Sequence, residues 1–317
     1  MNKQLSKSIF RSISMIAALV FLFSLSGCVS AQNKDCSAIQ LTIYHQNDFH
    51  GYKPDNLARI ATLVKQARKR GENVLFLNAG DLFTRGRYHY KYFGELEFAQ
   101  LNVMDLDAFT LGNNEFKATS SPETSQKILF DLTRQAVYPV LCANITFSDT
   151  GEYLPNIHPF TVLKLYNLRI GIMGLTADRV ASYPQAKGLT VTPALACAED
   201  VFTQLDSESD IQIALTHIGY EEDLKLAGML PELEAIVGGD SHTLLSQPTD
   251  VAGIPIVQAG GEQQQYLGRL VLNLIRNASG QWELSSYTGE LIKLDKTIKQ
   301  DPETLEVMQS ILSVPVN

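Results

Sequence analysis

Apolar residues along this chain repeat with two different spacings, one typical of helices and one typical of strands. From Leu57 to Ala67 they follow the i, i+3, i+4, i+7 spacing of one helical face, and Gly71 then favours a helix end. Short apolar runs bounded by polar residues predict buried strands. The helical spacing also predicts helices at residues 95–101, 125–136, 221–229 and 299–312, and the end of a helix at residues 200–205.

Strands are predicted between these helices. The apolar runs lie at residues 39–44, 73–77, 108–111, 137–143, 160–166, 169–175, 211–215 and 235–237. Asn167 separates two of them, which predicts a hairpin. From Val251 onward apolar and polar residues alternate, as at Leu270, Leu272 and Leu274, which predicts antiparallel strands. Strands that alternate with helices before an antiparallel region predict an α/β fold with mixed sheets.

The first 28 residues have the pattern of an export signal. Three basic residues precede an apolar run at residues 15–23, which is too short to span a bilayer. Leu25-Ser26-Gly27-Cys28 resembles the lipobox of bacterial lipoprotein precursors, in which cleavage leaves the cysteine as a lipidated N-terminus. We therefore expect a signal peptide at residues 1–28 and lipidation of Cys28. An ordinary signal peptide with an incidental cysteine is the alternative. Val29 is not the aspartate that signals inner-membrane retention, so the resemblance favours the outer membrane, facing the periplasm.

The rest of the chain divides into three parts. Polar residues 29–38 predict a short tether, residues 39–298 carry the alternating pattern of one domain, and residues 299–317 contain the last predicted helix. Once Cys28 carries lipid, Cys36, Cys142 and Cys197 remain, which leaves open either one disulfide or three thiols. The cysteines do not have the Cys-x-x-Cys spacing of a metal site.

The charge of the chain restricts its partners. The sequence has 26 basic and 34 acidic residues, a formal charge of −8. Removal of the predicted signal peptide takes away three basic and no acidic residues and changes the charge to −11. This balance argues against binding of a nucleic-acid polymer. Because anionic headgroups would repel the chain, we expect an acyl anchor to hold it at the membrane.

Five predicted strands run directly into side chains that ligate metal ions. In parallel sheets, ligands gather outside the carboxyl ends of the strands, so these five ends are expected to meet at one site. Each segment alone is also compatible with a turn, a helix cap or a buried histidine. The segments are Asn47-Asp48-Phe49-His50-Gly51, Asn78-Ala79-Gly80-Asp81, Gly112-Asn113-Asn114-Glu115, Thr216-His217 and Gly238-Gly239-Asp240-Ser241-His242.

This ordered set resembles the calcineurin-like metallophosphoesterases, and most closely the catalytic domain of bacterial periplasmic 5′-nucleotidases, over residues 39–275. The resemblance implies a four-layer α/β/β/α sandwich with two divalent metal ions between two mixed sheets. It assigns Asp48, His50, Asp81 and His242 to the first ion. It assigns Asp81, Asn113, His217 and Asp240 to the second, so that Asp81 bridges the two. Mn²⁺, Zn²⁺, Fe, Co and Mg²⁺ all remain open as the metal.

Three departures from the family pattern limit what the resemblance implies. The catalytic His/Asp dyad of the family is replaced by Asn114 and Lys117, and an amide cannot protonate a leaving group. Asp240 stands where a histidine ligand of the second ion is expected. The chain ends where the helix leading to the nucleotide-binding domain of the two-domain nucleotidases would begin.

Side chains near the motif loops are therefore the expected substrate contacts. Arg85 and Lys117 are the candidates for substrate binding, Asn114 for a phosphoryl contact, and His89 for the role of the missing acid. For Arg85, Lys117 and His89, a solvated surface position is the alternative. The predicted function is hydrolysis of a small phosphate ester whose leaving group is already acidic. The alternative is a catalytically impaired relative that keeps its metals for ligand binding or an envelope scaffold role. Sulfur-ester hydrolysis also fits the fold, and the oligomeric state is not predicted.

Overall fold

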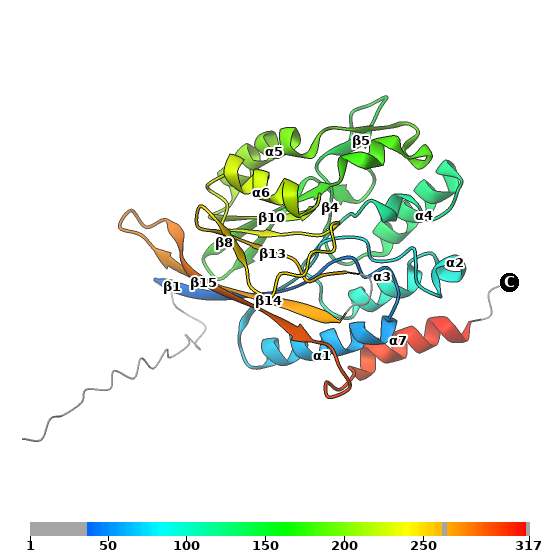
Figure 1. Ribbon diagram of the computed structural model, residues 1–317, viewed down its shortest axis with the longest axis horizontal. Coiled ribbons are helices and arrows are strands. Elements are labelled where there is room, and N and C mark those ends of the chain that lie inside the picture. Colours follow the sequence, from blue (N-terminus) through cyan, green and yellow to red (C-terminus); the bar gives the residue numbers. More distant parts are fainter. Residues whose placement is uncertain (1–36, 262–264, 315–317) are drawn as a thin grey trace, which may run out of the picture. The chain divides into compact units, whose positions relative to one another are not determined.

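The computed structural model describes residues 37–261 and 265–314 (Figure 1). Cys28, Cys36 and the predicted signal peptide lie outside the described residues. Within the described part, no helix combines the length and the apolar character needed to cross a bilayer. Cys142 and Cys197 are buried free thiols, so these two cysteines are not paired with each other.

The first sheet has seven strands and contains the N-terminal half of the predicted site. Five strands are parallel to their neighbours, beginning with β1, and β14 and β15 add antiparallel pairs beside β1. In spatial order the strands are β15 (Trp282–Lys293), β14 (Tyr266–Arg276), β1 (Ala38–Gln46), β2 (Asn73–Asn78), β3 (Ala108–Thr110), β4 (Val140–Leu141) and β6 (Ile157–His158).

The second sheet has six strands, and its four inner strands are parallel. Its outer strands are antiparallel to their neighbours, and β7 with β8 forms the predicted hairpin. The spatial order is β12 (Thr249–Val251), β13 (Ile254–Val257), β11 (Ala235–Val237), β10 (Ile211–His217), β8 (Leu168–Thr176) and β7 (Phe160–Leu165). A separate antiparallel pair joins β5 (Ile145–Phe147) and β9 (Leu189–Val191).

The two sheets stack face to face between two layers of helices (Figure 1). One core lies between the sheets and contains residues such as Leu41 of β1 and Ile213 of β10. A second core packs the first sheet against α1 (Pro54–Lys69), α3 (Glu95–Asn102) and α4 (Pro122–Gln135). A third core packs the second sheet against α5 (Ala194–Glu208) and α6 (Tyr220–Met229). The predicted four-layer α/β/β/α sandwich is confirmed.

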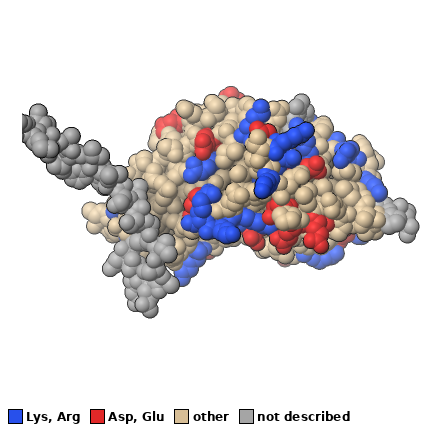
Figure 2. All heavy atoms as spheres, turned by 90° about the horizontal axis from the view of Figure 1, so that it is seen from below, with Lys and Arg blue, Asp and Glu red and all other residues tan. Residues whose placement is uncertain are grey.

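The C-terminal helix α7 (Pro302–Ser313) packs beside α1 and α3. The Asp301 side chain caps it by accepting a hydrogen bond from the Thr304 backbone N–H. Lys65 of α1 forms ion pairs of 2.8 Å with both Asp301 and Glu303. On the face seen in Figure 2, basic and acidic side chains lie next to one another.

Some predicted boundaries are wrong. The apolar run at residues 137–143 predicts one strand, but only Val140–Leu141 pairs, because the chain there crosses towards the second sheet, where Ala143 N–H donates to Gly174 O. The alternation at residues 254–257 predicts antiparallel pairing only, but β13 is parallel to β11. The short helix α2 (His89–Tyr92) and the short strands β5, β6, β9 and β12 have no clear periodicity in the sequence.

Candidate metal centre

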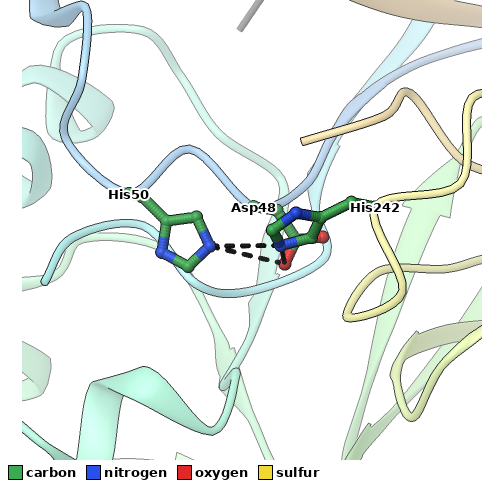
Figure 3. Close-up of side chains that lie close together, drawn as sticks. All are labelled: Asp48, His50 and His242. Carbon is green, nitrogen blue, oxygen red and sulfur yellow. Dashed lines mark hydrogen bonds and ion pairs between the residues drawn. The ribbon is translucent and has the colours of Figure 1, made fainter. Parts of the chain in front are cut away.

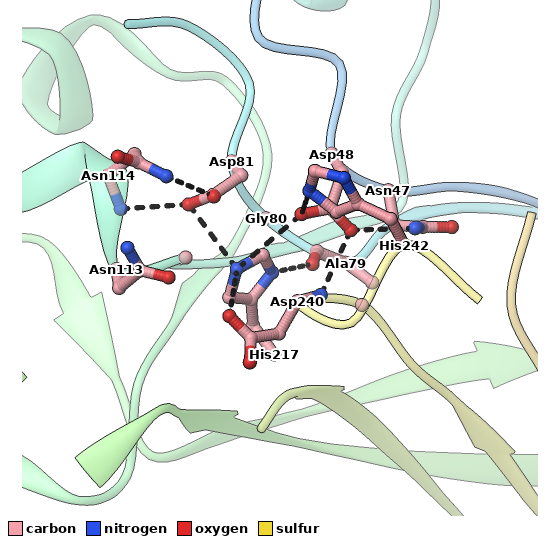
Figure 4. Close-up of polar contacts among 12 residues, drawn as sticks. Asn47, Asp48, Ala79, Gly80, Asp81, Asn113, Asn114, His217, Asp240 and His242 are labelled. Atoms are coloured by element: carbon pink, nitrogen blue, oxygen red, sulfur yellow. Dashed lines mark hydrogen bonds and ion pairs between the residues drawn. The ribbon is translucent and has the colours of Figure 1, made fainter. Parts of the chain in front are cut away.

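The strand ends that carry the predicted ligands meet in one place (Figure 4). Asp48 and His50 follow β1, Asp81 follows β2, and Asn113 follows β3. From the second sheet, His217 ends β10, while Asp240 and His242 follow β11. The two sheets therefore contribute ligands from opposite sides of the same centre.

The backbone of this region is strained at the predicted ligands. Five of the seven have positive φ, namely Asp48 at 51°, His50 at 52°, Asp81 at 56°, Asp240 at 78° and His242 at 54°. Positive φ is uncommon for residues other than glycine, and such strain clusters at functional sites. All five lie in the segments that follow β1, β2 and β11, where their side chains reach the centre.

Three of the four ligands predicted for the first ion, Asp48, His50 and His242, form a compact cluster (Figure 3). Asp48 Oδ1 lies 3.1 Å from His242 Nε2 and 3.8 Å from His50 Nε2. The two histidine Nε2 atoms are 3.3 Å apart, and Asp81 Oδ2 lies 3.6 Å from His50 Nε2. Asp48 Oδ1 is buried and has no hydrogen-bond partner among the described residues. Imidazole nitrogens and carboxylate oxygens at these separations fit one divalent cation.

His217 faces the carboxylates from the other side. Its Nδ1 lies 2.6 Å from Ala79 O, which fixes Nδ1 as the donor and turns Nε2 towards the centre. Nε2 lies 3.3 Å from Asp81 Oδ1 and 3.5 Å from Asp240 Oδ1. The two oxygens of Asp81 thus face two different histidines, which is the arrangement required of a bridging ligand.

Charges at the centre shift the pKa values of His217 and Asp81. Burial lowers the pKa of His217, but the nearby Asp81 and Asp48 carboxylates outweigh it and raise the pKa to about 10. Burial raises the pKa of Asp81, but His217 and His50 together shift it below its ordinary value. A bound cation would take over the role of the proton on His217, because metal binding to imidazole releases that proton.

Side chains around the ligands hold them in place. Both Glu115 carboxylate oxygens accept backbone hydrogen bonds, from Asp81 at 2.9 Å, Gly112 at 2.7 Å and Leu82 at 2.8 Å. Gly80 has φ of 85°, and a Cβ there would lie 2.7 Å from His217 Nδ1. The sequence analysis gave Glu115 no role. Its position directly after Asn114 in the motif could have pointed to one.

Comparison with known proteins identifies the family. The family model described as calcineurin-like phosphoesterase matches residues 41–244, which run from within β1 to beyond β11 and contain every predicted ligand. The chain belongs to the calcineurin-like phosphoesterase family.

Relatives and solved structures of this family include nucleotide hydrolases. The trifunctional nucleotide phosphoesterase YfkN of Bacillus subtilis is 26% identical over 83% of this chain and 20% of that protein. The 5′-nucleotidase of Vibrio cholerae is 28% identical over 93% of this chain and 60% of that protein. The 5′-nucleotidase precursor from Thermus thermophilus has a TM-score of 0.73 and 26% identity, covering 86% of this chain and 58% of that structure. The chain spans about a fifth to three fifths of the length of these relatives.

Arg179 is a charged residue at the candidate metal centre that the sequence analysis did not single out. It lies in the 3₁₀ helix Asp178–Ser182, which follows the end of β8. Its guanidinium donates to Asn113 Oδ1 at 2.7 Å and to Asp240 Oδ2 at 2.8 Å, and it also contacts Asp240 Oδ1. Ligands were expected at the carboxyl ends of parallel strands. The same expectation would have placed Arg179 at the centre, since Arg179 follows β8, which is parallel to β10.

A cavity of about 510 Å³ lies beside the candidate metal centre. Asn114, which donates to Asp81 through its backbone N–H at 2.8 Å and through its side-chain amide, forms part of its wall. The predicted substrate-binding residues Arg85 and Lys117 and the predicted acid His89 line the same cavity. The remaining lining residues are Thr84, Tyr90, Ala118, Thr119 and Ser120.

The surroundings of His89 are mainly aromatic. Its ring stacks on Phe83 with centroids 5.9 Å apart, and it meets Tyr90 and Phe93 edge-on. Burial lowers the pKa of His89, which favours the neutral imidazole at pH 7. A neutral imidazole is a weaker source of protons than the assigned acid role requires, and that role stays a prediction.

Proposed function

We propose that this chain is a metal-dependent, 5′-nucleotidase-like phosphoesterase that hydrolyses small phosphate esters whose leaving groups are acidic. The observation that carries the proposal is the convergence of three histidines and the Asp48 and Asp81 carboxylates at the ends of strands from two sheets. Membership of the calcineurin-like phosphoesterase family supports the reaction class. The nucleotidase relatives support a small phosphorylated substrate.

The residues present define separate roles in this reaction. Divalent ions at the centre would supply Lewis-acid polarisation of the phosphoryl group and lower the pKa of water. Asp48 and Asp81 would hold these ions, and the histidines would complete the ligand sets. The Asn114 amide, next to Asp81, would donate a hydrogen bond to a phosphoryl oxygen. Arg85 and Lys117 would place positive charge in the cavity that receives the leaving group.

The expected leaving group follows from Asn114 and Lys117 at the dyad positions. General acid catalysis contributes about 10²–10⁴-fold, and an amide with a lysine cannot supply it as the family dyad does. Alkyl phosphates therefore lose this contribution in full. Aryl esters and anhydrides lose less, because their leaving groups depart without protonation.

A specific observation favours a second candidate function. Two predicted ligands of the second ion, Asn113 and Asp240, are engaged by Arg179, and both dyad positions are substituted. A centre with these changes could keep a metal for ligand binding without turnover. This binding role is the alternative that the activity experiment must separate from the enzyme.

The experiment compares an aryl phosphate with AMP and a simple alkyl phosphate, using the purified protein with Mn²⁺. The proposal predicts release of phosphate from the aryl ester, slower release from AMP and from the alkyl ester, and loss of release from all three in Asp81→Ala. Asp131→Ala, which removes a surface carboxylate on α4, is the matched control and should keep full activity. Metal binding without phosphate release from any of the three esters would establish the binding role instead.

We also propose that the chain is exported and anchored in the outer membrane through lipid on Cys28. The support is the lipobox-like Leu25-Ser26-Gly27-Cys28 sequence after a short apolar run. Bacteria that express the chain and receive labelled palmitate should label the wild-type protein but not Cys28→Ser. Equal labelling of both proteins would refute the anchor, and membrane fractionation would then show whether the chain is exported in another way.

A further inference from the structure

The two ligand sets that the family resemblance assigns do not fit metal equally well. Nε2 and carboxylate atoms of the first set are turned towards one point. Each set holds a buried atom without a hydrogen-bond partner among the described residues, Asp48 Oδ1 in the first and His217 Nε2 in the second. In the second set, Asn113 Oδ1 and both Asp240 oxygens already accept hydrogen bonds from one side chain, Arg179. Asp240 is also the position at which the chain departs from the histidine of the family.

The Arg179 guanidinium competes directly with a second cation. A divalent ion bound by Asn113 and Asp240 would lie about 2.0–2.2 Å from their oxygens. The guanidinium nitrogens lie 2.7 and 2.8 Å from the same two side chains. A guanidinium cannot lose its charge in a protein, so it would repel an ion bound to the same oxygens.

The formal charges agree with this competition. Asp48, Asp81 and Asp240 carry −3 in total. One divalent ion and the Arg179 guanidinium together carry +3 and balance them. Two divalent ions and Arg179 would leave the centre at +2. The aspartate at position 240 adds only one negative charge relative to a neutral histidine, which does not offset the charge of a second ion.

We propose that Arg179 takes the place of the second metal ion, so that the chain binds a single divalent cation through Asp48, His50, Asp81 and His242. Arg179 supplies fixed positive charge beside that ion and is anchored by Asp240 and Asn113. This inference rests on the metal centre of the proposed function. It differs from the family resemblance, which implies two ions.

The test measures metal stoichiometry with Mn²⁺ alone as the probe. Purified wild-type protein and Arg179→Ala are saturated with Mn²⁺, separated from free ion, and analysed for manganese per chain and by electron paramagnetic resonance. We expect one Mn²⁺ and the spectrum of an isolated ion for wild type. For Arg179→Ala we expect two Mn²⁺ and the altered spectrum of a coupled pair.

Control variants keep the result interpretable. Arg169→Ala removes an arginine whose side chain is 49% exposed, as that of Arg179 is, and which pairs with Asp210 away from the centre. It should still bind one Mn²⁺. Arg179→Gln removes the charge but keeps a donor for Asp240, and it should also bind two Mn²⁺. It replaces Arg179→Ala in the test if Arg179→Ala fails to fold.

The outcomes separate this inference from the proposed function. Two Mn²⁺ on wild type, or one on every variant, would overturn the role of Arg179 while leaving a metal-dependent phosphoesterase intact. No Mn²⁺ on wild type would overturn both. One Mn²⁺ on wild type and two on Arg179→Ala, without release of phosphate from an aryl ester, would support the inference and contradict the proposed function.

Discussion

Replacement of Asp48 by asparagine separates the stability of the fold from stabilisation by metal. Asp48 Oδ2 accepts hydrogen bonds from Asn47 Nδ2 at 2.7 Å and from the Asp240 backbone N–H at 2.9 Å. In Asp48→Asn the amide oxygen can keep both bonds. The new NH₂ group then takes the place of Oδ1, 3.1 Å from His242 Nε2, where it has an acceptor. The metal-free variant keeps these hydrogen bonds but loses the Asp48 charge, which raises the pKa of His217, so the metal-free Tm of each protein is the reference for its own response to metal.

The two proteins should differ when metal is added. A ligand present at 100 times its Kd stabilises the native state by about 2.7 kcal/mol. For a domain of this size that raises Tm by roughly 5–10 °C, at about 2–4 °C per kcal/mol. Loss of a charged ligand weakens metal binding by on the order of 100-fold or more, since changes to residues that only support the ligands already cost about 10–100-fold. At the same Mn²⁺ concentration the variant then gains at most about 0.4 kcal/mol, or roughly 1 °C.

Differential scanning calorimetry of both proteins, with and without Mn²⁺, measures this difference. Asp131→Asn on the outer surface of α4 is the control and should show the wild-type response to metal. A full Mn²⁺-dependent rise in Tm for Asp48→Asn would refute the assignment of Asp48 as a ligand.

Residues around the centre and in the core allow three more tests. Glu115→Gln should destabilise the protein by about 1–3 kcal/mol in urea unfolding, because one backbone donor would face an NH₂ group; unchanged stability would remove its supporting role. Burial raises the pKa of Glu97 to about 7, above its ordinary 4.5. Its contribution to the free energy of unfolding is therefore complete below pH 4.5 and is lost as the pH rises to 7. Glu97→Gln should match wild type at pH 4.5 and exceed its stability at about pH 9 by roughly 3 kcal/mol in the same assay, and parallel pH curves would contradict this. Asn114→His combined with Lys117→Asp should raise hydrolysis of an alkyl phosphate by up to about 10²-fold, and an unchanged rate would show that the dyad does not limit turnover.

The ligand positions were predictable because each follows a strong local pattern. A buried strand is visible as an apolar run, and parallel strands bring their carboxyl ends to one edge of a sheet. The position of His217 at the end of β10 and of Asp240 just beyond β11 therefore followed from segments that could be read one at a time.

Other features depend on contacts that no local pattern encodes. The end of β8 places Arg179 near the centre, but its pairing with Asn113 and Asp240, 66 and 61 residues away, forms only after both sheets have formed. Strand β4 is short because its chain continues towards the second sheet, although its apolar run is longer.

Anomalous diffraction from crystals grown with Mn²⁺ tests the central claim, a metal centre formed by the strand ends, most directly. We expect a manganese peak within about 2.0–2.6 Å of ligand atoms of Asp48, His50, Asp81 and His242. The absence of manganese from these four side chains, or its binding only elsewhere on the protein, would contradict that claim.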